Sequence, residues 1–173
     1  MSRESNRMEI IVRGGESEDW EDAAAIYEDR AVIPNLLQIP YISRDAIRDR
    51  FENPAPDRHT LVAVVRERVV GLLGLHFGTG RQSHVASFGL MVHSDYQGRG
   101  VGTALLTAAI DLAENWLGCT RLELDVFTDN EGAIRLYERF GFEKEGTMRQ
   151  FAMRDGALAD VYLMARVRPS AGS

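Results

Sequence analysis

Residues Leu90 to Leu106 read LMVHSDYQGRGVGTALL, an apolar strand-like run followed by a glycine-rich loop and the start of a helix. The N-terminus of a helix leaves backbone N–H groups unpaired and carries a partial positive charge. Gly98, Gly100 and Gly102 have no side chains, so a pyrophosphate can come close to those donors. Arg99 adds a full positive charge beside them. The stretch therefore predicts an anion-binding loop, although the same glycines could serve only as a tight strand-to-helix turn.

Two familiar nucleotide-binding loops fit this stretch poorly. A Walker loop requires a lysine before the Ser or Thr that follows its last glycine, whereas Thr103 follows Gly102 directly. A dinucleotide-binding loop requires a third glycine where Leu105 stands. Glu123 does occupy the approximate place of the ribose-binding acid of such proteins, but the preceding strands do not form a βαβ pattern. Both nucleotide loops are disfavoured.

The composition is that of a soluble protein that folds as one domain. The 173 residues suffice for a sizeable core, with 45% hydrophobic and 27% charged residues. The net charge of −6 gives a nucleic-acid partner no electrostatic support, and no apolar run approaches the roughly 20 residues of a membrane-spanning helix. Cys119 is the single cysteine and the polar start is unlike a signal peptide, so we expect a cytoplasmic protein without an internal disulfide. We expect one domain over residues 8–168, with flexible tails at 1–7 and 169–173.

Hydrophobic periodicity and turn residues predict a mixed sheet with several helices. The predicted helices cover residues 17–30, 44–51, 100–117 and 130–140. The predicted strands cover residues 8–13, 60–66, 69–77, 83–93 and 121–127, with two more between 143 and 168 around the Asp155–Gly156 turn. Residues 31–43 contain two prolines and are predicted to form a loop. Strands outnumber helices and the early strands look like antiparallel neighbours, which indicates an α+β fold.

A second motif lies downstream of the glycine-rich loop. Asn130 is followed by residues 133–142, which read AIRLYERFGF. Together with QGRGVG at residues 97–102, this motif resembles the GNAT superfamily of acetyl-CoA-dependent N-acetyltransferases, and the similarity extends over about residues 9–167. The resemblance implies a GNAT fold, in which helices flank a mixed, mostly antiparallel central sheet. Three shorter stretches resemble in particular the bacterial members that acetylate the α-amine of free amino acids: residues 35–40, 83–86 and 160–162.

The resemblance implies that acetyl-CoA is the cosubstrate and that the glycine-rich loop holds its pyrophosphate. In such enzymes the strand before the loop splays at a bulge, where its backbone pairs with the pantetheine arm and one N–H polarises the thioester carbonyl. Leu90, Met91 and Val92 occupy that strand here, although their side chains could serve only as core. The expected cofactor contacts are Leu90, Met91, Val92, Gln97, Gly98, Arg99, Gly100, Val101, Gly102, Thr103, Asn130 and Tyr137.

The same resemblance suggests an acid but leaves the base open. Tyr137 matches the general acid of the family, which protonates the departing CoA thiolate. Relatives carry an acidic residue on the strand where Ser87 stands, and this chain lacks it. The candidates for the base are His84, which suits neutral pH, and Glu123 or Asp125 on the following strand. A chain of water molecules is a further route for the proton.

The resemblance implies transfer of an acetyl group from acetyl-CoA to a small primary amine, with a free amino acid as the leading acceptor. Acetylation of protein N-termini or lysines is one alternative, and it needs an open peptide groove. A non-catalytic acyl-CoA-binding module is another, against which the presence of Tyr137 argues. The loops around residues 31–43 and 148–160 are expected to select the acceptor. No metal is expected, because the histidines lack metal-ligand spacing. A homodimer is expected by analogy with the family.

Overall fold

The computed structural model describes residues 8–169, so the tails expected at 1–7 and 169–173 lie outside the described residues except for Pro169. The strands are β1 (Ile11–Gly14), β2 (Arg58–Val65), β3 (Arg68–Phe77), β4 (Val85–Val92), β5 (Arg121–Phe127), β6 (Glu143–Arg154) and β7 (Ala157–Val167). The helices are α1 (Trp20–Tyr27), α2 (Arg44–Glu52), α3 (Val101–Asp111) and α4 (Glu131–Arg139). Short 3-10 turns cover Ser17–Asp19, Ile33–Asn35, Gly80–Gln82 and Ser94–Tyr96.

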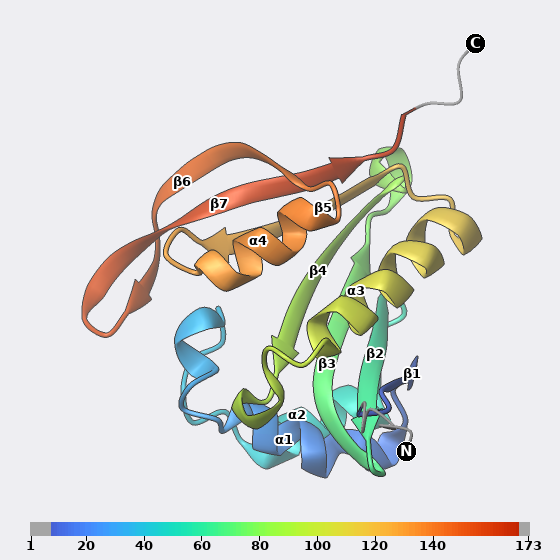
Figure 1. Ribbon diagram of the computed structural model, residues 1–173, viewed down its shortest axis with the longest axis vertical. Coiled ribbons are helices and arrows are strands. Elements are labelled where there is room, and N and C mark those ends of the chain that lie inside the picture. The colour runs from blue at the N-terminus through green and yellow to red at the C-terminus, as the bar shows by residue number, and fades with distance from the viewer. Residues whose placement is uncertain (1–7, 170–173) are drawn as a thin grey trace, which may run out of the picture.

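The strands form one sheet in the order β1-β2-β3-β4-β5-β7-β6 (Figure 1). β4 and β5 run parallel, whereas the other neighbouring strands run antiparallel. Parallel neighbours need a crossover connection, and α3 supplies it between β4 and β5. Figure 1 shows α3 in front of β2 and β3, with α4 beside β5. The predicted α+β class and the mixed, mostly antiparallel sheet are confirmed.

Two tight turns set the register of the long hairpins. The β2–β3 turn consists of Arg66 and Glu67, which have φ values of 48° and 66°. Positive φ at both central residues gives a two-residue hairpin loop whose twist suits the flanking strands. The predicted Asp155–Gly156 turn has the same character, with φ values of 49° and 78°. The first turn lies one residue earlier than predicted, so that β3 begins at Arg68.

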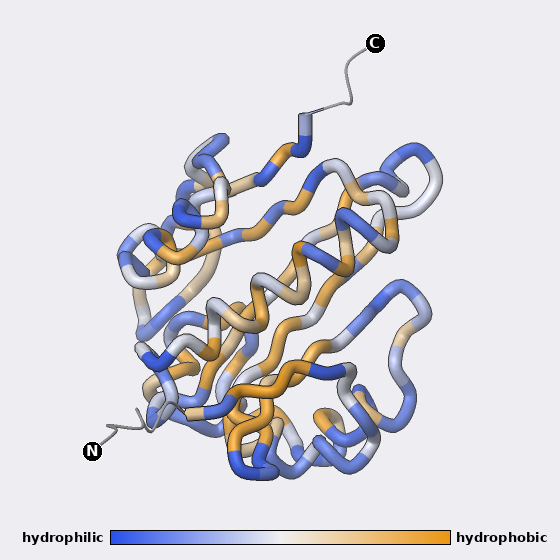
Figure 2. The backbone as a smooth tube through the Cα atoms, turned by 45° about the vertical axis from the view of Figure 1, so that its right-hand side comes forward, coloured by the Kyte–Doolittle hydropathy of each residue, from blue (hydrophilic) through white to orange (hydrophobic). Residues whose placement is uncertain are grey.

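The sheet carries a hydrophobic core on each face. α3 and α4 cover one face, where Leu105, Leu106 and Ile134 pack against the strands. α1 and α2 cover the other, where Ile26 and Ile47 are fully buried. Figure 2 shows the hydrophobic residues concentrated along the central strands and the helix that crosses them. Each large apolar side chain buried in this way contributes about 1.5–3 kcal/mol to folding.

Two predicted helices differ from the structure at their ends. The helix predicted over residues 17–30 opens with a 3-10 turn and ends at Tyr27. Asp29 beyond it instead accepts a hydrogen bond from the N–H of Ser94, 2.8 Å away. The helix predicted to reach residue 117 changes after Asp111 into the π-helical turn Leu112–Trp116. Glu114 in that turn pairs with the guanidinium of Arg166 in β7 at 2.7 Å. Both changes accompany tertiary contacts that local periodicity does not encode.

Candidate active site

β4 and β5 separate halfway along their length. Their pairing covers Val85 to Ser87 of β4 and Arg121 to Glu123 of β5 and then stops. Beyond this point β4 stays paired with β3 as far as Val92, and β5 stays paired with β7. One edge of each strand therefore presents backbone N–H and C=O groups that no neighbouring strand uses.

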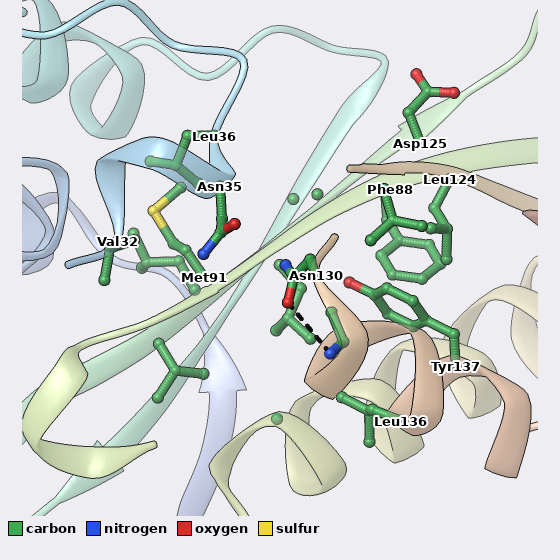
Figure 3. Close-up of a pocket in the computed structure, with 18 of the residues that line it drawn as sticks. Val32, Asn35, Leu36, Phe88, Met91, Leu124, Asp125, Asn130, Leu136 and Tyr137 are labelled. Carbon is green, nitrogen blue, oxygen red and sulfur yellow. Dashed lines mark hydrogen bonds between the residues drawn. The ribbon is translucent and has the colours of Figure 1, made fainter. Parts of the chain in front are cut away.

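The separation was expected at a bulge, but the register between β3 and β4 is regular from Phe77–Ala86 to Gly71–Val92. The opening thus comes from divergence of β4 from β5, not from a bulge against β3. A cavity of about 950 Å³ lies at this opening and reaches both faces of the sheet. Figure 3 shows Leu36 and Met91 on one side of β4 and Phe88 and Tyr137 on the other.

Successive residues of β4 point to opposite faces, so this strand divides the cavity into two parts. Phe88 and Leu90 belong to the core beneath α3 and α4, and we call this part the α3/α4 side. Met91 packs against the core beneath α1 and α2, and Ser87 and Gly89 share its face. We call this part the α1/α2 side.

The glycine-rich loop lies at the end of β4 and leads into α3. Gly98 and Gly100 have φ values of 69° and 89°, which side chains rarely adopt. The first hydrogen bond of α3 runs from the N–H of Ala104 to the carbonyl of Gly100, so the N–H groups of residues 101–103 have no partner within the helix. Gly102 allows α3 to approach α4, because a Cβ there would lie 3.2 Å from Cδ2 of Leu136. The loop therefore presents several backbone donors and no bulky side chain to the cavity.

The expected cofactor residues of this loop divide into three groups. Gln97, Gly98, Gly100, Gly102 and Thr103 line the cavity. The Gln97 amide also donates to the carbonyl of Val92 at 3.0 Å, which ties the loop to β4. Val101 is 1% exposed and its side chain belongs to the core, so only its backbone can face an anion. Arg99 is exposed, with its guanidinium 5.9 Å from the ring of Tyr96.

Tyr137 projects from α4 into the α3/α4 side of the cavity. Its ring is 6% exposed and lies edge-on to Phe88 and Phe142, with both centroid distances 5.9 Å. The hydroxyl points into the cavity (Figure 3). Burial raises the pKa of this phenol, and no hydrogen bond to the described residues opposes that effect. The hydroxyl is therefore protonated at neutral pH and available as a donor.

Asn130 begins α4 and also lines the cavity. Its side-chain oxygen accepts a hydrogen bond from the N–H of Ala133 at 3.3 Å, which is the contact of a helix N-cap. This capping bond fixes the start of the helix that carries Tyr137. The amide nitrogen of Asn130 is left for a further contact.

A row of polar side chains crosses the sheet on the α1/α2 side. Arg58 of β2 pairs with His76 of β3, His76 pairs with Ser87 of β4, and Ser87 pairs with Glu123 of β5. Cross-strand partners share one face of a sheet, and all four residues line the cavity. Asp125 lies two residues beyond Glu123 and lines it as well. Sequence analysis did not identify Arg58 or His76 as site residues, because the register that aligns them is not written in any local motif.

The candidate bases occupy different environments. Glu123 is paired with the guanidinium of Arg121 at 2.8 Å. Asp125 has no such partner among residues 8–169, and desolvation together with the charge of Glu123 raises its pKa. His84 is exposed in the turn before β4 and lies outside the residues that line the cavity. The structure thus brings the two acids to the site and leaves His84, which was expected on the strand, away from it.

The segment between α1 and α2 lines the α1/α2 side of the cavity. Val32 and Leu36 face the cavity there, together with Gln38. Arg50 of α2 donates to the side chain of Gln38 at 3.2 Å and to the hydroxyl of Tyr27 at 3.4 Å. Arg50 thus links the segment to α2 and links α2 to α1.

No helix within residues 8–169 is long and apolar enough to cross a membrane. The same range holds no cluster of three or more His, Cys, Asp or Glu side chains placed to share one metal ion.

Comparisons with known proteins show what this chain is similar to. A sequence model of the acetyltransferase (GNAT) family matches residues 20–142. The chain is 40% identical over 161 residues to the L-amino acid N-acetyltransferase AaaT of Escherichia coli, covering 92% of this chain and 99% of that protein. A GNAT-family acetyltransferase from Streptococcus pneumoniae shares the fold with a TM-score of 0.79, at 23% identity and with 92% and 99% of the two chains covered. Spermidine N-acetyltransferase from Vibrio cholerae, solved in complex with CoA and spermine, has a TM-score of 0.83 at 22% identity, with 92% and 95% covered.

Proposed function

Since this chain belongs to the acetyltransferase (GNAT) family and is an N-acetyltransferase, we propose that it transfers an acetyl group from acetyl-CoA to the α-amine of a free amino acid. The observation that carries the proposal is the cavity at the divergence of β4 and β5. It offers an anion-binding loop and a buried phenol on the α3/α4 side and two carboxylates on the α1/α2 side. An amine and a thioester that enter from opposite faces can therefore meet at one point.

The residues of the α3/α4 side fit acetyl-CoA. The N–H groups at the start of α3 suit the pyrophosphate, and Gly98 and Gly100 leave room for it. The unpaired edge of β4 from Phe88 to Val92 can bind the pantetheine amides as an added strand would bind. When bound, acetyl-CoA supplies an acyl group activated as a thioester. Leu90, Met91 and Val92 contribute through this backbone, and Asn130 and Tyr137 border it from α4.

Residues from both sides of the cavity fit the proton transfers. The acceptor amine must give up a proton before its nitrogen bonds to the acetyl carbon. Asp125 and Glu123 can hold the ammonium form and pass that proton to water. As the carbon–sulfur bond breaks, Tyr137 can donate its proton to the sulfur and regain one from solvent. Once bonded to the acetyl carbon, the nitrogen loses its second proton to solvent, so the ammonium form and acetyl-CoA give the amide, the CoA thiol and one free proton.

A free amino acid suits the cavity better than a protein chain. The segment that contains Val32, Leu36 and Gln38 borders the acceptor side and is attached to α2 through Arg50. We infer that this border restricts the access of an extended peptide to the cavity. The amino-acid specificity in the name of the Escherichia coli relative points the same way. The presence of a buried phenol without a hydrogen-bond partner among residues 8–169 argues against a non-catalytic acyl-CoA-binding module.

The deciding experiment measures CoA release with a thiol reagent across matched acceptors. The panel contains L-amino acids, polyamines, and peptides with free N-termini or lysines, each at several concentrations. We expect turnover with amino acids and at least tenfold lower kcat/KM with the peptides. Preferential turnover of peptides would support the protein acetyltransferase alternative. Acetyl-CoA binding in calorimetry without turnover of any acceptor would instead favour the binding-module alternative.

We further propose that the protein forms a homodimer, as expected by analogy. Phe151, Met153 and Leu158 on the β6–β7 hairpin are 41%, 66% and 52% exposed, and a second copy could cover them. Sedimentation velocity over a range of concentrations tests this, and a monomer at all of them would contradict it.

A further inference from the structure

On the α1/α2 side of the cavity, which we propose binds the acceptor, two glycines leave a hollow on the surface of the sheet. Gly74 of β3 and Gly89 of β4 are direct cross-strand partners, and both line the cavity. A Cβ atom added at either glycine would meet nothing within 4 Å. The last residue pair between β4 and β5 is Ser87 and Glu123, and Gly89 lies two residues beyond Ser87 on the same face of β4. A ligand lying over the two glycines is therefore adjacent to the opening that leads to the α3/α4 side.

Arg58 borders this hollow with an incompletely used guanidinium. Its Nη2 lies 3.3 Å from Nε2 of His76. Its Nε is buried and has no hydrogen-bond partner in the described part of the chain, residues 8–169. No carboxylate of residues 8–169 forms an ion pair with it, whereas Arg121 and Arg154 pair with carboxylates and Arg50 donates to Gln38. A buried donor left unpaired is costly, so this position is favourable for an anion.

The surroundings of Arg58 support an anion from outside the protein. Burial and the adjacent guanidinium lower the pKa of His76, so that the ring is neutral at pH 7 and accepts from Arg58. The charge of Asp57 acts in the opposite direction on His76. Arg50 also lines the cavity, but its guanidinium is already engaged by Gln38 and Tyr27.

We propose that Arg58 binds the α-carboxylate of the acceptor amino acid over the hollow formed by Gly74 and Gly89. This inference rests on the proposed function and extends it to the substrate class. The amine and the carboxylate of an α-amino acid share one carbon, so they lie within one interstrand spacing of about 4.8 Å. When the carboxylate lies above β3, near Arg58, the amino acid extends over β4. Its amine then points toward the opening between β4 and β5. Leu36, Leu72 and Met91 line the remaining wall, which suits an apolar side chain.

The test removes the carboxylate from the acceptor and the guanidinium from the protein in the same design. L-Leucine and 3-methylbutylamine differ by the carboxylate, and kcat/KM is measured for both with wild type, Arg58→Gln and Arg58→Lys. Comparing the ratio of the two substrates between proteins cancels the intrinsic reactivity of each amine. Arg81→Gln serves as the charge control, because Arg81 is exposed on the Gly80–Gln82 turn outside the cavity.

We expect Arg58→Gln to lower kcat/KM for leucine by about 10- to 100-fold, the range of a hydrogen bond between charged groups. The value for 3-methylbutylamine should change less than threefold, and Arg58→Lys should lose part of the leucine preference because an ammonium cannot bind the carboxylate through two parallel bonds. An equal loss on both substrates would make Arg58 a structural residue. Equal turnover of both substrates by wild type would overturn the carboxylate site yet leave acetyl transfer intact, even if Arg58→Gln failed to fold. Absence of turnover with every amine would refute the proposed function itself.

Discussion

Replacement of Tyr137 by phenylalanine separates the chemistry of the site from its packing. The ring keeps its edge-on contacts with Phe88 and Phe142, whose centroids lie 5.9 Å away in both cases. The hydroxyl forms no hydrogen bond with residues 8–169 that the change would break. We therefore expect the free energy of unfolding to change by less than about 1 kcal/mol. Loss of a general acid should lower kcat by about 10²- to 10⁴-fold, which corresponds to about 3–5 kcal/mol of activation free energy.

Three measurements on Tyr137→Phe check this reasoning: thermal unfolding, acetyl-CoA affinity by calorimetry, and steady-state turnover. Stability and affinity should match wild type while kcat falls. The matched control is Phe142→Leu, which disturbs the same ring cluster at a 2% exposed position and leaves the hydroxyl in place. That variant should lose stability and keep most of its kcat. Full turnover by Tyr137→Phe, or an equal loss of kcat in both variants, would show that the Tyr137 hydroxyl is not the general acid and that the residue serves in packing.

Three further predictions concern the loop and the candidate bases. Gly102→Asp should weaken acetyl-CoA binding in calorimetry at least tenfold, because it puts negative charge at the start of α3. Gly14→Asp makes the same charge change in open space at the end of β1 and should bind acetyl-CoA normally. Asp125→Asn should raise the melting temperature at pH 7 and lower kcat/KM, since the raised pKa of Asp125 means that ionisation disfavours the folded state. The carboxyl of Asp125 stays protonated to a higher pH in the native state than in the unfolded chain. The stability gained by Asp125→Asn should therefore vanish below about pH 3.9, where the unfolded carboxyl is also protonated. His84→Ala should leave the rising limb of the pH–rate profile unchanged, because His84 is exposed outside the cavity, and loss of that limb would restore it as a base.

Local signals in the sequence were sufficient for the α3/α4 side of the site. The glycine-rich loop and the helix that begins after Asn130 follow from spacing within short segments, and the resemblance to the family pointed to Asn130 and Tyr137 as site residues. The structure brings these segments together around the cavity, as the resemblance to the family implied. Each depends on neighbours within a few residues in the chain, which is the range that periodicity can report.

The α1/α2 side could not be predicted in this way. Arg58 and His76 become neighbours only through the β2–β3 register, which the turn at Arg66 and Glu67 fixes. A difference of two residues in the start of β4 was enough to move His84 from a strand to an exposed turn. Boundaries and registers depend on packing across the sheet, so the residues that face the acceptor appear only when the strands are aligned.

The alternation of β4 has a consequence for altering this enzyme by design or by natural drift. Ser87, Gly89 and Met91 face the α1/α2 side of the cavity, which we propose binds the acceptor, while Phe88 and Leu90 face the α3/α4 side. A mutant library restricted to the odd-numbered positions can therefore explore new acceptors while the cofactor surface stays constant. Deleting one residue of the strand would exchange the two sets of side chains and damage both surfaces at once. Substitutions, and not insertions or deletions, are thus the route by which acceptor preference can diverge in this part of the chain.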